Sequence, residues 1–219
     1  MRIILVRHGD PDYEKDRLTE IGRKQAEIVA KRLLSEGITE VYSSPLGRAV
    51  ETAEYFRDVS GLEVKTLDFM EEIRFGKKEA LYESGSPWIV VDELMNEGYD
   101  ISDPSWKELP QFKENVVVED VEKICIKTDE WLSSLGYERE GLYYRNTNEE
   151  NSQKTIAIFA HGGSGSAMFS RILNIPFLYL CATLHMPHTA ISILRFDKIP
   201  GTLTTPVIEL LSDATHLKD

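Results

Sequence analysis

Apolar runs that suit buried strands alternate with segments of helical spacing along the first third of the chain. Residues 3–6 (IILV) form a continuous aliphatic run, which is typical of a strand covered on both faces. Thr19 is a suitable N-cap for a helix that should end at Gly37, because glycine commonly follows the last helical turn. The apolar positions of this expected helix are Ile21, Ala26, Val29, Leu33 and Leu34.

The alternation then continues. Residues 38–42 predict a short strand, and Ser43, Ser44 and Pro45 should end it and open a second helix. We place Pro45 in the first turn of that helix, where a proline costs no hydrogen bond. A short strand near Val64 should follow.

The same order returns near the end of the chain. Residues 155–160 (TIAIFA) predict a strand, 161–163 a turn and 164–173 a helix. Two closing strands are expected at 190–196 and 204–210. Strands that alternate with helices favour an α/β fold, so we expect a three-layer α/β/α architecture around a mostly parallel central sheet.

The middle of the chain has a different pattern. Helices are expected at 87–97 and 119–135, whereas 136–153 is polar and includes an Asn/Glu-rich loop at 146–151. We interpret residues from about 77 to about 153 as a helical insert beside the active site, within a single domain that spans 1–219. Its aromatic side chains could form a lid over a substrate or, as we prefer, a satellite core. They are Trp106, Phe112, Tyr143 and Tyr144.

Composition narrows the classes of partner. The formal net charge is −12, and a negative field of this kind disfavours nucleic acid and anionic membranes as partners. A small anionic substrate stays possible, because a few arginines can reverse the local potential. Cys125 and Cys181 lie in mostly apolar segments without metal-ligand spacing, which favours buried thiols over a disulfide. The apolar run at 3–6 is too short for a signal peptide, so a soluble cytoplasmic protein is expected.

Candidate chemistry gathers where strands end. Arg7 and His8 follow the first strand, Arg48 follows the second, and His161 follows the strand at 155–160. Ligands of open parallel sheets bind outside the carboxyl ends of the strands. The sequence therefore predicts a pocket with two imidazoles and two guanidiniums, which suits a phosphoryl group. One imidazole could act as a nucleophile, and a carboxylic acid could protonate the leaving group.

Five short motifs carry a resemblance to a known family. They are RHG (7–9), LTEIGRKQA (18–26), SSPLGRAVETA (43–53), EEIRFG (71–76) and AHGG (160–163). In this order they resemble the histidine phosphatase superfamily, which contains the cofactor-dependent phosphoglycerate mutases and many small phosphatases. The resemblance covers about residues 1–80 and 155–196, and it implies a phosphoglycerate mutase-like fold.

The resemblance also implies roles for particular residues. His8 matches the nucleophile that becomes phosphorylated, and Arg7 and Arg48 match the arginines that bind the phosphoryl group. His161 matches the second histidine, which stabilises the transferring group, and the backbone amide of Gly162 lies where it could reach a phosphate oxygen. No resident cofactor or metal is implied.

The proton donor is less sharply placed. Glu72 matches the family's acid, but Glu71 is adjacent and is an alternative. His188 stands where small phosphatases often have asparagine. His185 and His188 could suggest a metal pair, but they lack carboxylate or cysteine companions, so we expect loop or pocket-wall histidines.

These matches favour a phosphatase that hydrolyses a small phosphomonoester by way of a phosphohistidine. A phosphoglycerate mutase is the first alternative. It is disfavoured because Tyr13 and Glu14 replace the tryptophan and asparagine that mutases carry there, and a carboxylate would repel an acidic substrate. An inactive relative that binds phosphorylated ligands or proteins is the second alternative. The sequence does not specify the substrate or the oligomeric state.

Overall fold

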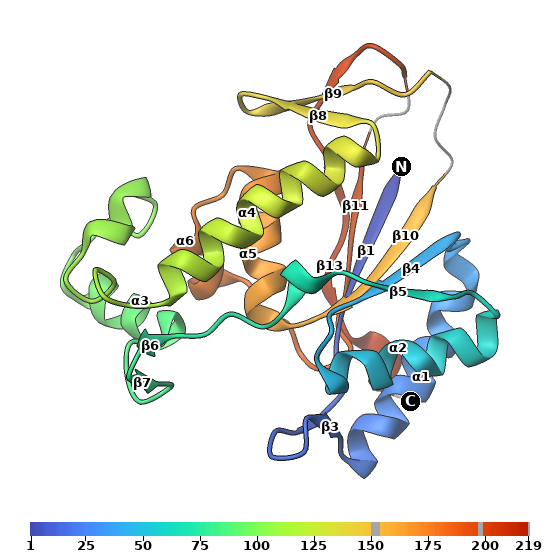
Figure 1. Cartoon of the computed structure of the whole chain (residues 1–219), viewed down its shortest axis with the longest axis horizontal. Helices are drawn as coiled ribbons and strands as arrows, with labels where there is room; N and C mark the ends of the chain where they lie inside the picture. The colour runs from blue at the N-terminus through green and yellow to red at the C-terminus, as the bar shows by residue number, and fades with distance from the viewer. Residues whose placement is uncertain (150–153, 197–198, 219) are drawn as a thin grey trace.

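The computed structural model describes residues 1–149, 154–196 and 199–218. A six-stranded sheet in the order β13-β11-β1-β10-β4-β5 forms its centre (Figure 1). The strands are β1 (Arg2–Arg7), β4 (Glu40–Ser43), β5 (Val64–Thr66), β10 (Thr155–Ala160), β11 (Ile191–Arg195) and β13 (Val207–Asp213). Neighbours from β1 through β10 and β4 to β5 are parallel, and β11 and β13 are added antiparallel. The predicted mostly parallel sheet is confirmed.

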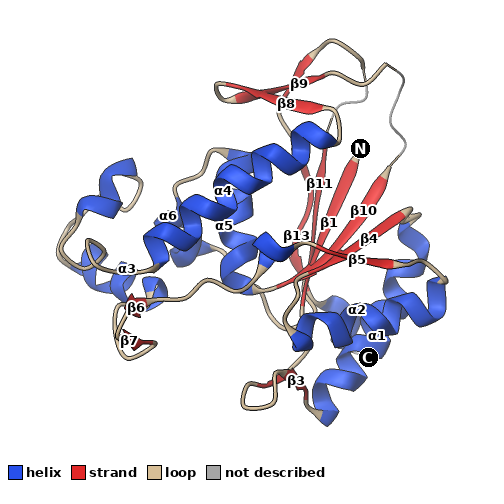
Figure 2. Ribbon diagram, in the orientation of Figure 1, coloured by secondary structure: helices blue, strands red, loops and turns tan. Residues whose placement is uncertain are grey.

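Helices cover both faces of this sheet, as Figure 2 shows. The helices α1 (Glu20–Leu33) and α2 (Gly47–Ser60) lie on one face, and α4 (Val117–Ser134) and α5 (Gly162–Leu173) lie on the other. The side chains of β1 alternate between the two layers. Ile4 and Val6 join the apolar cluster under α1 and α2, whereas Ile3 and Leu5 join the larger cluster on the opposite face. This double burial explains the unbroken aliphatic run and confirms the three-layer architecture.

The first helix begins as expected. Thr19 is the N-cap, and its Oγ1 accepts a hydrogen bond from the backbone N–H of Gly22 at 3.0 Å. A short 3₁₀ turn follows α1 and ends at Gly37, whose φ of 67° is the left-handed conformation that favours glycine. The predicted apolar face is wrong at two positions, because Ile21 and Leu34 are exposed.

The helices α2 and α5 begin at other residues than predicted. Pro45 lies before α2, because the strand ladder continues through the backbone N–H of Ser44 to Phe159 and the chain turns only at Leu46. The helix after β10 begins at Gly162 rather than at residue 164, so the expected turn at 161–163 is already its first turn. The last strand runs three residues later than predicted, from Val207 to Asp213, and its pairing with β11 contains register shifts.

The middle of the chain contains both expected helices. The helix α3 (Pro87–Asn96) and α4 match the predicted spans closely. The sequence did not reveal the small sheet in the order β12-β9-β8, nor the short helix α6 (Phe177–Thr183). The strands of this sheet are β8 (Tyr137–Glu140), β9 (Tyr143–Asn146) and β12 (Leu203–Thr204). Of the loop expected at 146–151, residues 150 and 151 lie outside the described residues.

The aromatic residues of the middle segment join the main core. Trp106, Phe112 and Tyr144 are buried in the same apolar cluster as Ile3 and Leu5, whereas Tyr143 is exposed. The lid alternative for these four side chains is therefore wrong. They do not form a separate satellite core either, because the cluster is continuous with the sheet.

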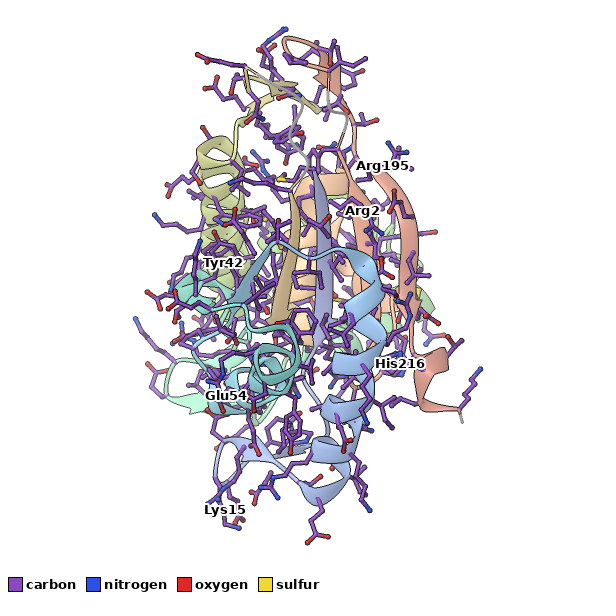
Figure 3. All side chains as sticks on the ribbon, turned by 90° about the vertical axis from the view of Figure 1, so that its right-hand side faces the viewer. Arg2, Lys15, Tyr42, Glu54, Arg195 and His216 are labelled. Atoms are coloured by element: carbon purple, nitrogen blue, oxygen red, sulfur yellow. The ribbon has the colours of Figure 1, made fainter. Side chains whose placement is uncertain are left out.

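Charged pairs protect the outer edge of the sheet. Figure 3 shows Arg2 and Arg195 on the same side of the molecule. Glu209 of the edge strand β13 accepts a hydrogen bond from the Nε of each arginine, at 2.8 and 2.7 Å. Such charges reduce the tendency of an edge strand to pair with another chain.

Two further expectations have outcomes in the structure. Cys125 and Cys181 are free thiols, as predicted. Across the residues with described positions, every helix is too short or too polar to cross a membrane.

Candidate functional site

The sheet register brings the predicted residues together. In the parallel ladders Arg7 pairs with Ala160, and Phe159 pairs with Ser43. His8 and His161 therefore leave the sheet at the same level, and their ring centroids lie 5.1 Å apart. Residues that are about 150 positions apart in sequence share one site for this reason.

His8 is held by its own turn. Its side chain is buried, and its Nδ1 lies 2.7 Å from the carbonyl oxygen of Gly9. A carbonyl oxygen only accepts, so Nδ1 carries the proton and Nε2 has a free lone pair. Burial, with smaller contributions from Arg7 and Arg48, lowers the pKa of His8 to about 3. The imidazole is therefore neutral at physiological pH.

Gly9 is required by close packing behind His8. A Cβ there would lie 2.6 Å from the carbonyl oxygen of Gly22 in the first turn of α1. The Gly9 N–H also donates to Thr52 Oγ1 of α2 at 3.1 Å. The turn that carries His8 is thus fixed against both helices on that face of the sheet.

Arg48 lies in the first turn of α2 and is oriented by a loop carboxylate. Its Nη1 donates to Asp16 Oδ1 at 2.6 Å, and Asp16 Oδ2 accepts the N–H of Gly47 at 2.6 Å. Asp16 has a left-handed φ of 47°, a conformation that aspartate tolerates better than most residues. The Arg48 guanidinium also lies over the Tyr13 ring, 5.3 Å from its centroid. The sequence analysis missed Asp16, since a loop carboxylate has no pattern of its own.

Three polar atoms around His8 are buried without a partner among the described residues. They are Arg7 Nε, Arg48 Nε and His161 Nδ1. Arg7 is anchored through Nη1 to the carbonyl oxygen of Met186, and His161 through Nε2 to Ser44 Oγ at 2.7 Å. Burial and the neighbouring cationic groups lower the pKa of His161. Buried polar atoms normally have partners, and the two arginine N–H groups are donors, so this cluster suits an anion.

The side chain of Glu72 lies against the first turn of α5. Its Oε1 accepts the N–H groups of Ser164 and Ile73 at 2.9 and 3.0 Å, and its Oε2 accepts that of Gly163 at 3.3 Å. Burial raises the pKa of this carboxyl group, although the backbone donors oppose that shift. Glu72 lines the cavity of the site, whereas the adjacent Glu71 is exposed.

A third histidine borders the same cluster. The ring of His188 lies 5.6 Å from that of His8, and its Nδ1 is 3.5 Å from Asp10 Oδ1. His185 is exposed at the cavity wall. Within the part of the chain that the structure describes, no three His, Cys, Asp or Glu side chains converge as a metal site would need.

The cluster opens into a cavity of about 840 Å³. Arg7, Arg48, Glu72, Gly162 and Gly163 form its polar end. Aromatic side chains to which the sequence analysis gave no place in the cavity also line it. They are Tyr13, Phe75, Tyr82 and Trp88. The position of Phe75 three residues after Glu72 was the available indication.

Comparison with known proteins gives the family. Residues 3–207 match the model of the histidine phosphatase superfamily, branch 1. A curated relative from Yersinia pestis (strain Pestoides F), named "Probable phosphoglycerate mutase GpmB", is 26% identical over 99% of this chain and 95% of its own length.

Solved structures share the fold. A phosphoserine phosphatase from Entamoeba histolytica, in complex with 3-phosphoglyceric acid, has a TM-score of 0.66 at 21% identity over 99% of this chain and 98% of its own. A mycobacterial glucosyl-3-phosphoglycerate phosphatase has a TM-score of 0.65 at 18% identity over 97% and 99%. The chain belongs to the histidine phosphatase superfamily, as the sequence motifs predicted.

Proposed function

We propose that this member of the histidine phosphatase superfamily hydrolyses a small phosphomonoester through a phosphohistidine on His8. The observation that carries the proposal is the state of His8. Its Nδ1 is bound to the Gly9 carbonyl oxygen, which leaves Nε2 unprotonated, and the guanidiniums of Arg7 and Arg48 lie close enough to lower the pKa of the ring. A neutral imidazole held by a hydrogen bond at its other nitrogen is the arrangement that an attacking histidine requires.

The reaction has two displacements. His8 Nε2 attacks phosphorus, the bond from phosphorus to the ester oxygen breaks, and the leaving oxygen takes the proton of the Glu72 carboxyl group. Water then attacks the phosphohistidine, gives a proton to the Glu72 carboxylate, and the P–N bond breaks to release inorganic phosphate. Glu72 suits the first step because its raised pKa keeps it protonated to a higher pH than an ordinary glutamate, and it suits the second because the same raised pKa makes its carboxylate a stronger base.

Charge on the transferring phosphoryl group is met by fixed donors. Arg7 and Arg48 provide guanidinium N–H groups, His161 provides Nδ1, and Gly162 provides a backbone N–H at the start of α5. We assign the charge-stabilising role to these groups. We therefore propose that turnover needs no metal ion.

Mutase activity is the second candidate, and the relative named as a phosphoglycerate mutase supports it. Such a reaction needs the site to hold a substrate that carries a carboxylate besides its phosphate. Tyr13 lines the cavity, whereas Glu14 is exposed and is not among the lining residues. The repulsion expected from Glu14 is therefore weaker than the sequence implied. The preference for hydrolysis over the mutase reaction then depends on the side chains that line the cavity.

Product analysis separates the possibilities. The protein is mixed with p-nitrophenyl phosphate and a panel of phosphomonoesters, with and without EDTA, and inorganic phosphate is measured from pH 5 to 8. Hydrolysis that EDTA leaves unchanged supports the proposal. Isomerised phosphoglycerate, formed in the presence of bisphosphoglycerate without phosphate release, would support the mutase. Tight phosphate binding with no turnover of any ester would support an inactive binding protein.

A further inference from the structure

We infer that the organic part of the substrate is uncharged and carries an aromatic ring or an apolar group of similar size. This inference rests on the proposed phosphomonoester hydrolysis and concerns the same cavity. It is based on the aromatic residues that line the cavity and on the kinds of charge that line it.

Three aromatic rings form the wall. Phe75 lies at the centre, with Tyr82 edge-on at 5.0 Å between centroids and Trp88 edge-on at 6.5 Å. They come from three segments: the loop after Glu72, the end of the β6–β7 hairpin (Gly76–Lys77 and Ala80–Leu81), and the first turn of α3. Edge-to-face arrangements are favourable for aromatic rings, so the wall is a coherent apolar surface.

Tyr82 is held at the wall against its own backbone preference. Its φ is 67°, in the left-handed region that a bulky residue rarely adopts. Its backbone N–H donates to the carbonyl oxygen of Phe75 at 2.9 Å, which fixes the hairpin over that ring. The Tyr82 side chain nevertheless stays 58% exposed, so its ring can contact a ligand in the cavity.

Aliphatic side chains continue the apolar lining. Leu46, Ile73, Leu184 and Met186 also line the cavity. A cavity of about 840 Å³ is much larger than a phosphate ion needs, and it lies within the usual range for sites that enclose small organic molecules. The extra room is therefore bordered mainly by groups that gain from contact with apolar surface.

The charges of the cavity do not suit a second anionic group. Among its lining residues in the described part of the chain, the cationic side chains are Arg7, Arg48 and, when protonated, His185. Arg7 and Arg48 face the phosphoryl group in the proposed reaction. Arg74 is nearby in sequence, but its Nε and Nη2 both bind the Asp120 carboxylate, at 3.0 and 2.7 Å. A substrate carboxylate would lose hydration without gaining a guanidinium or ammonium partner.

Three primary alkyl phosphates test this inference. They are propyl phosphate, 3-phenylpropyl phosphate and 3-carboxypropyl phosphate. Because their leaving alkoxides are closely matched, the need for proton donation is the same. Enclosing a phenyl group should make kcat/KM about 10- to 100-fold higher for the phenyl-bearing ester than for propyl phosphate. The carboxylated ester should be the poorest of the three.

Variants then locate the effect. Trp88→Ala and Phe75→Ala should lower kcat/KM for the phenyl-bearing ester by about tenfold or more and lower that for propyl phosphate much less, so the ratio of the two should fall. Trp88→Leu keeps an apolar side chain in α3 and guards against loss of folding. Tyr143→Ala removes an exposed tyrosine that does not line the cavity, and it should change the turnover of neither substrate.

The outcomes separate this inference from the proposed function. Hydrolysis of p-nitrophenyl phosphate with no preference for the phenyl-bearing ester over propyl phosphate would overturn the inference alone. So would a preference for the carboxylated ester, or a Trp88→Leu variant that loses activity on all three esters equally. Absence of any phosphate release, including from p-nitrophenyl phosphate, would overturn the proposed function itself.

Discussion

Glu72 Oε1 accepts the backbone N–H of Ser164 at 2.9 Å, which binds this carboxyl group to the first turn of α5. Two opposing effects act there. The helix start and three backbone donors favour the ionised form, whereas burial favours the protonated form. Burial is the larger effect, and the pKa is raised. A half-buried carboxyl group that lines a cavity, yet is held by N–H donors, is suited to gaining and losing a proton in turn.

Replacement of Glu72 by glutamine should separate substrates by their leaving group. The glutamine amide keeps an oxygen acceptor for the Ser164 N–H but cannot give up a proton at the required step. We expect turnover of an alkyl phosphate to fall by roughly 10²- to 10⁴-fold, as is usual for loss of a general acid. Turnover of p-nitrophenyl phosphate should fall much less, because its leaving group needs little protonation.

The pH dependence of alkyl phosphate turnover should report the same proton donation by Glu72. The donor form of Glu72 is lost as pH rises through its raised pKa, so wild-type activity on alkyl phosphates should decline on the alkaline side. Glu72→Gln should remove that decline. Glu71→Gln is the matched control at an exposed position. If Glu71→Gln has the larger effect on alkyl phosphates, the acid has been assigned to the wrong neighbour.

Gly163→Ala should displace the Glu72 carboxyl group, because the added methyl group would clash with it. A Cβ at Gly163 would lie 2.5 Å from Glu72 Oε1 and 2.4 Å from Ile73 Cγ1, so the acid must move. We expect the substrate-dependent loss seen with Glu72→Gln, measured as the ratio of alkyl to p-nitrophenyl phosphate turnover. At Gly162 a Cβ would meet Arg7 Nε at an ordinary 3.8 Å, so Gly162→Ala should change this ratio far less. Equal changes in the ratio would contradict the placement of Glu72.

Runs of apolar residues predicted the central strands β1 and β10, because these strands are buried along most of their length. The aliphatic runs at β1 and β10 identify strands buried on both faces, and the residues after them become neighbours through the parallel register. The meeting of His8 and His161 could therefore be predicted before any coordinates were known.

Features that depend on long-range packing could not be predicted in this way. The β8–β9 hairpin is short, and of its apolar side chains Tyr137 and Tyr144 are buried against Phe196 whereas Leu142 and Tyr143 are exposed. Phe75 lies three residues after Glu72, but no sequence pattern favoured Trp88 over Trp106 as a cavity residue. All are aromatic residues in or beside the middle segment, and only the path of the chain decides which of them face the cavity.

His8→Ala should abolish turnover, and wild type should carry phosphate on His8. Nε2 bears the lone pair that the proposed reaction uses, and alanine removes it. After rapid mixing with substrate and quenching without acid, mass spectrometry should find one phosphoryl group on the peptide that contains His8. Because the pKa of His8 is lowered to about 3, labelling should persist between pH 5 and 8 without an acidic limb due to this group. Phosphate on another residue, in stoichiometric amount, would contradict the assignment.

Buried neutral histidines should make stability fall on the acidic side of pH 6.5. The pKa values of His8 and His161 are lowered in the folded chain, so below about pH 6.5 the unfolded chain takes up protons that the folded chain does not. Each such histidine should cost about 1.4 kcal/mol of unfolding free energy per pH unit in this range. Urea unfolding from pH 7.4 to 5.0 measures the slope.

A variant pair isolates this linkage. His161→Gln removes one titrating group, so its slope between pH 6.5 and 5.0 should be shallower than that of wild type. Ser44→Ala removes the hydroxyl partner of His161 Nε2, a hydroxyl that also accepts the Leu46 N–H at 3.3 Å, and should leave the imidazole buried and neutral, with a slope near wild type. Identical slopes for His161→Gln and wild type would show that His161 is protonated in the folded chain.

Asp16 should act by positioning Arg48 rather than by touching the substrate. Its two carboxylate oxygens hold Arg48 Nη1 and the Gly47 N–H, so Asp16→Ala frees the guanidinium and the loop together. We expect KM for p-nitrophenyl phosphate to rise on the order of tenfold, which corresponds to about 1.4 kcal/mol. Asp16→Asn keeps an oxygen acceptor and a residue type that tolerates a left-handed φ, so KM should rise much less. Because Asp16→Asn also removes a negative charge beside Arg48, inorganic phosphate should inhibit that variant more strongly than wild type. Weaker inhibition by phosphate in Asp16→Asn, with KM unchanged in Asp16→Ala, would show that Arg48 is positioned by other contacts.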